Sequence, residues 1–128
     1  MDDVTCTERA YTAEAPRSGW VHPQQNYYAP EQQPAPAEAD LQHLLVMDDS
    51  AIVRYGRGAS PDDRAALRDW AATQVSVVVA PAGARDSAQV EAFTFDRHLS
   101  CDGVDTQQLS DFASRRGAIQ PELHDDSG

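Results

Sequence analysis

The sequence contains no lysine, and all ten of its basic residues are arginines. Against them stand 21 acidic residues, which give a formal net charge of -11 at pH 7. A chain this acidic is repelled by phosphate groups, so neither nucleic acid nor an anionic membrane is expected as a partner. The acidic surface is expected mainly to keep the protein soluble, although it would also suit a cationic ligand or a basic partner protein.

Long apolar stretches are also absent. No segment approaches the roughly 18 apolar residues that a membrane-spanning helix needs. The first residues, MDDVTCTERAYTAEAP, are acidic early on and contain no apolar segment of the kind found in secretory signal peptides. We therefore predict a cytoplasmic protein without membrane contact.

Cysteine is scarce, since the chain contains only Cys6 and Cys101. The two are far apart and form no CxxC motif, so neither has the spacing of a metal site. In a reducing cytoplasm we expect two free thiols, with a single disulfide between them as the alternative.

Aromatic residues make up 7% of the chain and only three are phenylalanines, so the core has to be built mainly from valine, alanine and leucine. The 128 residues suffice for one domain with a core of moderate size. We expect the compact core to comprise residues 41–117 and the tail, residues 118–128, to be frayed.

Residues 1–40 contain most of the prolines and show neither helical nor strand periodicity. Disordered tails seldom keep large aromatic side chains, yet this segment contains Trp20, Tyr27 and Tyr28. We therefore predict a proline-rich segment that wraps around the folded body and is held to it by these rings.

The stretch HLLVMDDSAIVRYG, residues 43–56, places two apolar runs around a pair of aspartates. The preceding run, LQHLLVM, suits either a buried strand or a helical turn, whereas AIVRY is rich in β-branched residues and predicts a strand. Short polar residues such as Asp48, Asp49 and Ser50 suit a tight connection. A hairpin is therefore the predicted structure.

The clearest local signal is Ser60-Pro61-Asp62-Asp63. It offers a hydroxyl N-cap, a proline whose missing N–H costs nothing at the first helical position, and acids at the positive end of the helix dipole. The apolar stripe that follows predicts a helix as far as about Thr73 and consists of Ala66, Leu67, Trp70 and Ala71.

Three further elements follow this helix. Residues 75–81, VSVVVAP, are apolar on both alternating faces and predict a central strand, and residues 90–96, VEAFTFD, predict another strand. Asp105 caps a last helix that ends near Gly117, with an apolar stripe of Leu109, Phe112 and Ala113. The order predicts an α+β fold with a small mixed or antiparallel sheet, two helices and the proline-rich N-terminal wrap.

With these elements placed, residues 16–122 resemble a bacterial family known as domain of unknown function 3105. The segments that carry the resemblance are Ser18-Gly19-Trp20-Val21-His22, Tyr27-Tyr28-Ala29-Pro30, and residues 43–56, 60–70, 75–81 and 92–112. The family has a His-x-x-Glu-His cluster of metal-ligand or acid/base type. This sequence keeps His43 there but has Met47 or Gln42 in place of the glutamate. The resemblance therefore implies a site that has lost at least one ligand.

Histidine and carboxylate residues mark the candidate catalytic site. A carboxylate can orient an imidazole for proton transfer near neutral pH, and His43 lies close in sequence to Asp48 and Asp49. His22 is a further candidate if the wrapping segment brings it to His43. The alternative is a surface histidine beside a turn with two solvated aspartates.

Large rings and an arginine would then form the substrate pocket. The residues we assign to it are Trp20, Tyr27, Tyr28, Tyr55, Phe95 and Arg54. The alternative for the rings is a loop anchored to the core, and for Arg54 a charge balanced by nearby acids. His98 and Cys101 form a third candidate, a nucleophile pair, although no oxyanion-hole motif accompanies them.

Together these features predict a small acid/base enzyme or ligand-binding catalyst that needs neither metal nor cofactor and acts on a small organic molecule. Isomerisation, cyclisation or elimination in bacterial specialised metabolism would fit such a protein, which could form a homodimer. His43 and Asp48 would transfer the proton. One alternative is a zinc- or copper-binding module with His22, His43 and a carboxylate as ligands. Another is an acidic interaction module with a vestigial pocket.

Overall fold

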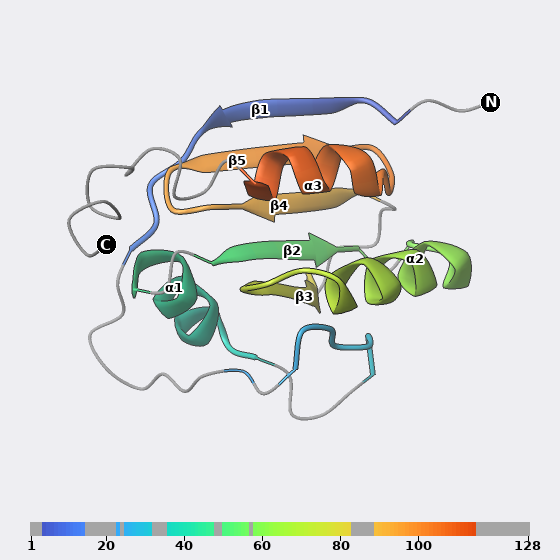
Figure 1. Ribbon diagram of the computed structural model, residues 1–128, viewed down its shortest axis with the longest axis horizontal. Coiled ribbons are helices and arrows are strands. Elements are labelled where there is room, and N and C mark those ends of the chain that lie inside the picture. The colour runs from blue at the N-terminus through green and yellow to red at the C-terminus, as the bar shows by residue number, and fades with distance from the viewer. Residues whose placement is uncertain are drawn as a thin grey trace.

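The fold is that of a computed structural model, which describes residues 4–14, 23, 25–31, 36–47, 50–56, 58–82 and 89–114 (Figure 1). Along the chain the elements are β1 (Cys6–Ala10), α1 (Glu38–Met47), β2 (Ala51–Tyr55), α2 (Pro61–Ala72), β3 (Val77–Pro81), β4 (Val90–Phe93), β5 (Arg97–Cys101) and α3 (Thr106–Ser114). The predicted α+β class with a small mixed sheet is confirmed. The described part of the chain has three helices where two were predicted.

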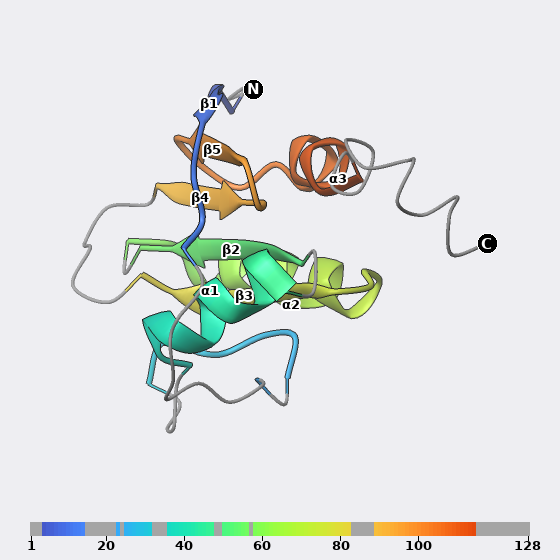
Figure 2. The same ribbon diagram turned by 90° about the vertical axis from the view of Figure 1, so that its left-hand side faces the viewer.

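The five strands form one sheet in the order β1-β5-β4-β2-β3. β2 and β3 are parallel and are connected through α2, whereas the other neighbouring pairs are antiparallel. Figure 1 shows β1 at one edge of the sheet and β3 at the other. In the side view of Figure 2, α2 and α3 lie on the same side of the sheet.

Alternation along the strands divides the apolar side chains between two hydrophobic clusters, one on each face. In β3, Val77 and Val79 pack in the cluster that contains α2 and α3, while Val78 and Ala80 pack in the cluster that contains α1. The helix residues buried on the first face are Leu67, Trp70, Ala71, Leu109, Phe112 and Ala113. Those buried on the second are Leu41, Leu44 and Leu45.

The helix predicted after Ser60 is confirmed. α2 begins at Pro61, and the Ser60 hydroxyl accepts a hydrogen bond from the Asp63 backbone N–H at 3.1 Å. Within the predicted stripe Ala66 is exposed, and the buried residues are Leu67, Trp70 and Ala71. Local capping chemistry was therefore enough to place this helix.

The last predicted helix is confirmed as α3, with its apolar stripe buried. Its predicted end near Gly117 lies outside the described residues. None of the described helices combines the length and the hydrophobicity that crossing a bilayer requires.

The hairpin predicted for residues 43–56 is wrong, because residues 38–47 form the helix α1. The predicted element started at Leu41, and the apolar run from there to Met47 is too short to show a helical period. The acids of the first helical turn, Glu38 and Asp40, were assigned to the preceding segment. The helical spacing is visible in the buried leucines, which are Leu41, Leu44 and Leu45. The strand predicted after it is confirmed as β2.

β3 was predicted to be a central strand, but it is the last strand of the sheet. It is apolar on both faces because α1 covers one face and α2 the other. Part of its outer edge is paired with the N-terminal segment: the Val79 N–H donates to the Asn26 backbone oxygen at 2.6 Å, and the Tyr28 N–H donates to the Val79 backbone oxygen at 2.8 Å. An edge strand protected in this way can have the composition of a central one.

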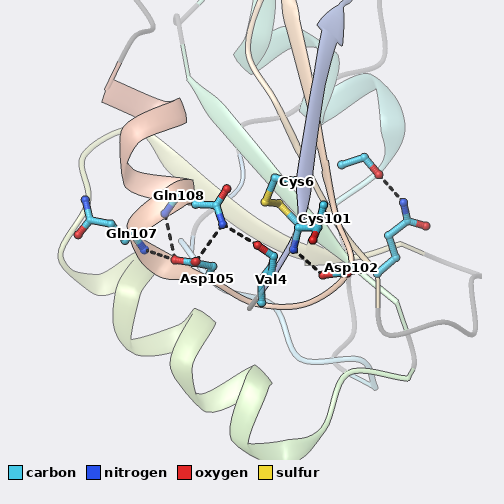
Figure 3. Close-up of a disulfide and its surroundings, with 10 residues drawn as sticks. Val4, Cys6, Cys101, Asp102, Asp105, Gln107 and Gln108 are labelled. Atoms are coloured by element: carbon cyan, nitrogen blue, oxygen red, sulfur yellow. Dashed lines mark hydrogen bonds between the residues drawn. A yellow bond between two sulfur atoms is a disulfide. The ribbon is translucent and has the colours of Figure 1, made fainter. Parts of the chain in front are cut away.

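β1 and β5 were not predicted as strands. They pair antiparallel, with Cys6 directly opposite Cys101. The two cysteines form a disulfide with Cα atoms 4.0 Å apart, which joins β1 to β5 in Figure 3. The expectation of free thiols is therefore wrong. The two residues are 95 positions apart in sequence, and only the strand pairing brings them together.

Candidate binding site

The predicted catalytic histidine lies on α1. His43 is 6% exposed, with its neighbours Leu44 and Leu45 packed against the sheet. Asp48, Asp49 and His22 lie outside the described residues. Convergence of His43 with these groups therefore stays a prediction.

The predicted pocket tyrosines lie together beside β2. The rings of Tyr27 and Tyr55 are stacked, with 6.0 Å between centroids and 3° between planes. The Tyr55 hydroxyl donates a hydrogen bond to the Tyr28 backbone oxygen at 2.6 Å. Burial of this hydroxyl, followed by its contact with Tyr27, raises the pKa of Tyr55 well above its ordinary value. In these positions the tyrosines anchor the N-terminal segment to the sheet.

The other residues assigned to the pocket are dispersed. Phe95 is in the turn between β4 and β5 and is 39% exposed, and Trp20 lies outside the described residues. Arg54, on β2, makes an ion pair of 2.6 Å with Glu38 of α1, and its guanidinium also donates to the Pro81 backbone oxygen at 2.8 Å. Arg54 thus connects α1, β2 and the end of β3.

A groove of about 490 Å³ opens where the last turn of α1, the beginnings of β2 and β3, and the N-terminal segment meet. This volume is in the range of roughly 300–1,000 Å³ that is typical of small-molecule sites. We call the cavity the Ser50 groove. The residues that line it are Pro23, Gln25, Asn26, Leu44, Ser50, Ser76, Val77 and Val78.

Ser50 is the distinctive polar residue of the Ser50 groove. It is only 3% exposed, and its backbone N–H donates to the Leu44 backbone oxygen at 3.2 Å. Its hydroxyl makes no hydrogen bond with any residue that the structure describes. Ser50 lines the groove, so a hydroxyl at this position, with no bond to another described residue, is suited to bind a ligand there.

The opposite wall of the groove is held in place by main-chain and amide contacts. The Asn26 side-chain amide donates to the Ala71 backbone oxygen at 3.2 Å, and Gln25 donates from its side-chain amide to the Tyr27 backbone oxygen at 3.2 Å. Asn26 lines the groove and its amide nitrogen is engaged, so its side-chain oxygen is the group that remains as an acceptor. None of the described lining residues carries a charge.

Ser76, which also lines the groove, has an unusual backbone conformation. Its φ is 58°, in the left-handed region that side chains other than glycine seldom adopt. Its backbone oxygen accepts a hydrogen bond from the Ala51 N–H at 2.9 Å, which fixes the starts of β2 and β3 relative to each other. Such backbone conformations are concentrated at functional sites.

A second group of chemically competent residues lies on β4 and β5. His98 Nε2 is 3.0 Å from Glu91 Oε2, and the two side chains are 13% and 14% exposed. Both project from the face opposite α2 and α3, since their neighbours Ala92 and Leu99 pack in the α2–α3 cluster. The His98 ring is stacked on Phe93, with 4.5 Å between centroids.

A carboxylate and an imidazole in contact could act as an acid/base couple, but the cavity beside Glu91 and His98 is too small for a substrate. The neighbouring cavity, beside Tyr11 and Phe93, measures about 40 Å³, which admits water but no organic substrate. No sequence pattern indicates the pair, because it depends on the register of β4 and β5, and β5 was not predicted.

Two of the sequence hypotheses can be compared with these positions. The proposed nucleophile pair of His98 and Cys101 is wrong, because the Cys101 sulfur is bonded to Cys6 and offers no thiolate. Within the described ranges there is no group of three or more histidine, cysteine or acidic side chains placed to hold a metal ion. His22, one of the proposed ligands, lies outside those ranges.

Comparison of the chain with known protein families, with curated proteins and with solved structures finds no match. The resemblance to domain of unknown function 3105 therefore stays a prediction. The function has to be argued from the geometry of the Ser50 groove itself.

Proposed function

We propose that the protein binds a small, uncharged carbonyl compound in the Ser50 groove. The observation that supports this most directly is the position of Ser50, which lines a cavity of about 490 Å³ and whose hydroxyl makes no hydrogen bond with another described residue. A hydroxyl that can donate is satisfied by a carbonyl oxygen.

The other lining residues support the same class of ligand. A charged ligand buried in the groove would need an opposite charge or several strong donors, and the described lining offers neutral amides, hydroxyls and aliphatic side chains. Leu44, Val77 and Val78 supply apolar contact for the carbon skeleton. An uncharged molecule with one or two polar atoms matches this lining.

We extend the proposal to acid/base catalysis without a cofactor, as the sequence predicts. The carbonyl group acidifies the protons on the adjacent carbon, which isomerisation, cyclisation and elimination reactions remove. Asp48 and Asp49 immediately precede Ser50 in sequence, which supports one of them as the general base. His43 and His22 are the candidates for the second proton-transferring group.

Binding can be tested by titrating isotope-labelled protein with 2-butanone and with N-methylacetamide and following the backbone amide signals by NMR. We expect signals of Ser50 and Ser76 to shift. Ser50→Ala should weaken binding about three- to tenfold, the usual worth of one hydrogen bond, while the midpoint of thermal unfolding stays the same or rises because no protein bond is lost.

The matched control is Ser114→Ala at the exposed end of α3, which should bind like the wild type. If neither probe shifts the groove signals at millimolar concentration, or if Ser50→Ala destabilises the fold without changing affinity, the binding proposal fails.

The catalytic extension needs its own measurement, the exchange of the protons next to the 2-butanone carbonyl for deuterium. Asp48→Asn, Asp49→Asn and His43→Ala should each be measured, and removal of the general base should lower the exchange rate at least about a hundredfold. Equal rates in all three variants and the wild type would refute catalysis by these residues and leave binding intact.

Other sequence hypotheses remain proposals with less support. The zinc or copper module would need His22 and His43 to meet, and the interaction module would use the acidic surface. A homodimer also stays a prediction. The predicted cytoplasmic location has the Cys6–Cys101 disulfide against it, because such bonds persist chiefly in oxidising compartments.

A further inference from the structure

Two exposed apolar side chains flank the Ser50 groove. Met47 is 64% exposed and Val75 is 78% exposed. Met47 follows the lining residue Leu44 by one helical turn, and positions three apart lie on the same helix face. Val75 immediately precedes the lining residue Ser76.

Both positions are at the end of the sheet where the groove lies. α1 ends at Met47 and β2 begins at Ala51, so Met47 is close to Ser50 in the chain. The Ala51 N–H is bonded to the Ser76 oxygen at 2.9 Å, which holds the Val75 segment beside the same end of β2. Met47 and Val75 are therefore each close in the chain to residues that line the groove, and we call the pair the apolar rim.

The third large apolar side chain that the described residues leave exposed is Phe95. It is in the turn between β4 and β5, whereas the groove lies at β3, on the other side of β2. Phe95 is therefore a side chain of the same class that does not border the groove.

We infer that the ligand of the Ser50 groove is amphiphilic, an uncharged carbonyl compound whose alkyl tail lies across the apolar rim. This inference rests on the proposed function. The polar end is satisfied by Ser50 inside the groove, where space is limited to about 490 Å³. The tail leaves the groove and covers Met47 and Val75, which would otherwise stay in water at a cost in free energy.

A homologous series of methyl ketones, from 2-butanone to 2-decanone, tests the inference because the carbonyl stays constant while the tail grows. Burying one methylene group strengthens binding up to about fourfold. We expect the dissociation constant, measured by NMR titration, to fall two- to fourfold per methylene until the tail extends beyond the rim.

The double variant Met47→Ser/Val75→Ser should remove this dependence on chain length while it keeps the wild-type affinity for 2-butanone. Phe95→Ser is the matched control and should retain the full dependence. Both variants replace exposed side chains, so neither should change the stability of the fold. An unchanged midpoint of thermal unfolding verifies that they are folded.

The outcomes separate this inference from the proposal on which it rests. Equal affinity for short and long ketones, or a chain-length effect that persists in the double variant, overturns the apolar rim and leaves carbonyl binding in place. If no ketone binds, both fail. If 1-alkanols of equal length bind as well as the ketones do, the tail is recognised and the carbonyl is not.

Discussion

The Asp105 carboxylate accepts three hydrogen bonds at the beginning of α3. Its Oδ1 accepts hydrogen bonds from the Gln107 and Gln108 backbone N–H groups at 3.0 Å and 3.2 Å, and its Oδ2 accepts from the Gln108 side chain at 2.9 Å (Figure 3). The same Gln108 side chain donates to the Val4 backbone oxygen at 3.0 Å. One cap therefore begins α3 and also ties it to the segment before β1.

The pKa of Asp105 predicts how stability depends on pH. The Gln108 side-chain hydrogen bond, followed by the backbone bonds, lowers this pKa in the folded protein. The carboxylate therefore stabilises the fold fully above its ordinary pKa of about 3.9, and this contribution is lost as the pH falls through the lowered value.

Asp105→Asn should accordingly lose less stability than the wild type as the pH falls below about 5 and then through the lowered pKa of Asp105, because this group takes up its proton there. The free energy of unfolding, from urea titrations at each pH, measures the difference. Asp111→Asn on the same helix, for which the cap is intact, is the control. Parallel pH curves for wild type and Asp105→Asn would contradict the prediction.

Single residues also show where sequence reasoning stopped. The capping role of Asp105 could be predicted because it depends on neighbours in the chain. The unpaired hydroxyl of Ser50 could not, because a serine next to two aspartates suits an ordinary turn. Its importance follows from its place in the wall of the Ser50 groove, which only the fold determines.

Among the elements, β1 depends most on its links to other parts of the chain. None of its residues is fully buried, so apolar packing contributes little to holding it. It is held by its ladder with β5, by the 2.8 Å ion pair of Glu8 with Arg97, and by the disulfide of Cys6 with Cys101. Water weakens an exposed ion pair such as Glu8–Arg97, but it does not weaken the covalent disulfide bond.

We predict that loss of the disulfide lowers the free energy of unfolding by about 4 kcal/mol, because the closed loop is long and its closure restricts the unfolded chain. Urea unfolding of the oxidised wild type and of Cys6→Ala/Cys101→Ala measures the difference. Amide hydrogen exchange should show β1 losing protection before the other strands.

Dithiothreitol provides the internal control for this prediction. The reduced wild type should unfold at nearly the same urea concentration as the double variant, and the variant itself should not respond to the reductant. Unfolding midpoints that do not differ between the oxidised and reduced wild type would show that the bond contributes nothing to stability.

Elements with strong local signals were the predictable ones. α2 has a hydroxyl cap, a proline and a clear apolar stripe, and β2 is rich in β-branched residues. β1 and β5 have no such pattern: in β1 the burial follows no strict alternation, and β5 carries Arg97, His98 and Ser100 beside its two buried residues. Their strand structure is imposed by pairing, not by composition.

For the whole molecule, the fold class followed from the alternation of strands and helices, but the order of strands in the sheet did not. The sheet order places β3 at an edge although its composition suggests the centre, and it brings β1 next to β5. The Ser50 groove has the same origin, since it is assembled from Pro23, Gln25 and Asn26, the end of α1, Ser50 and the start of β3. Contacts between such distant segments leave no periodicity in a single sequence.

The pairing of β1 with β5 also has a consequence for synthesis on the ribosome. The two cysteines opposite each other are 95 residues apart, so at about 5–20 residues per second β1 waits roughly 5 to 20 s for its partner. During this interval the nascent chain carries a strand with no sheet to join. The pairing of β1, and with it the meeting of Cys6 and Cys101, is therefore possible only after translation of β5.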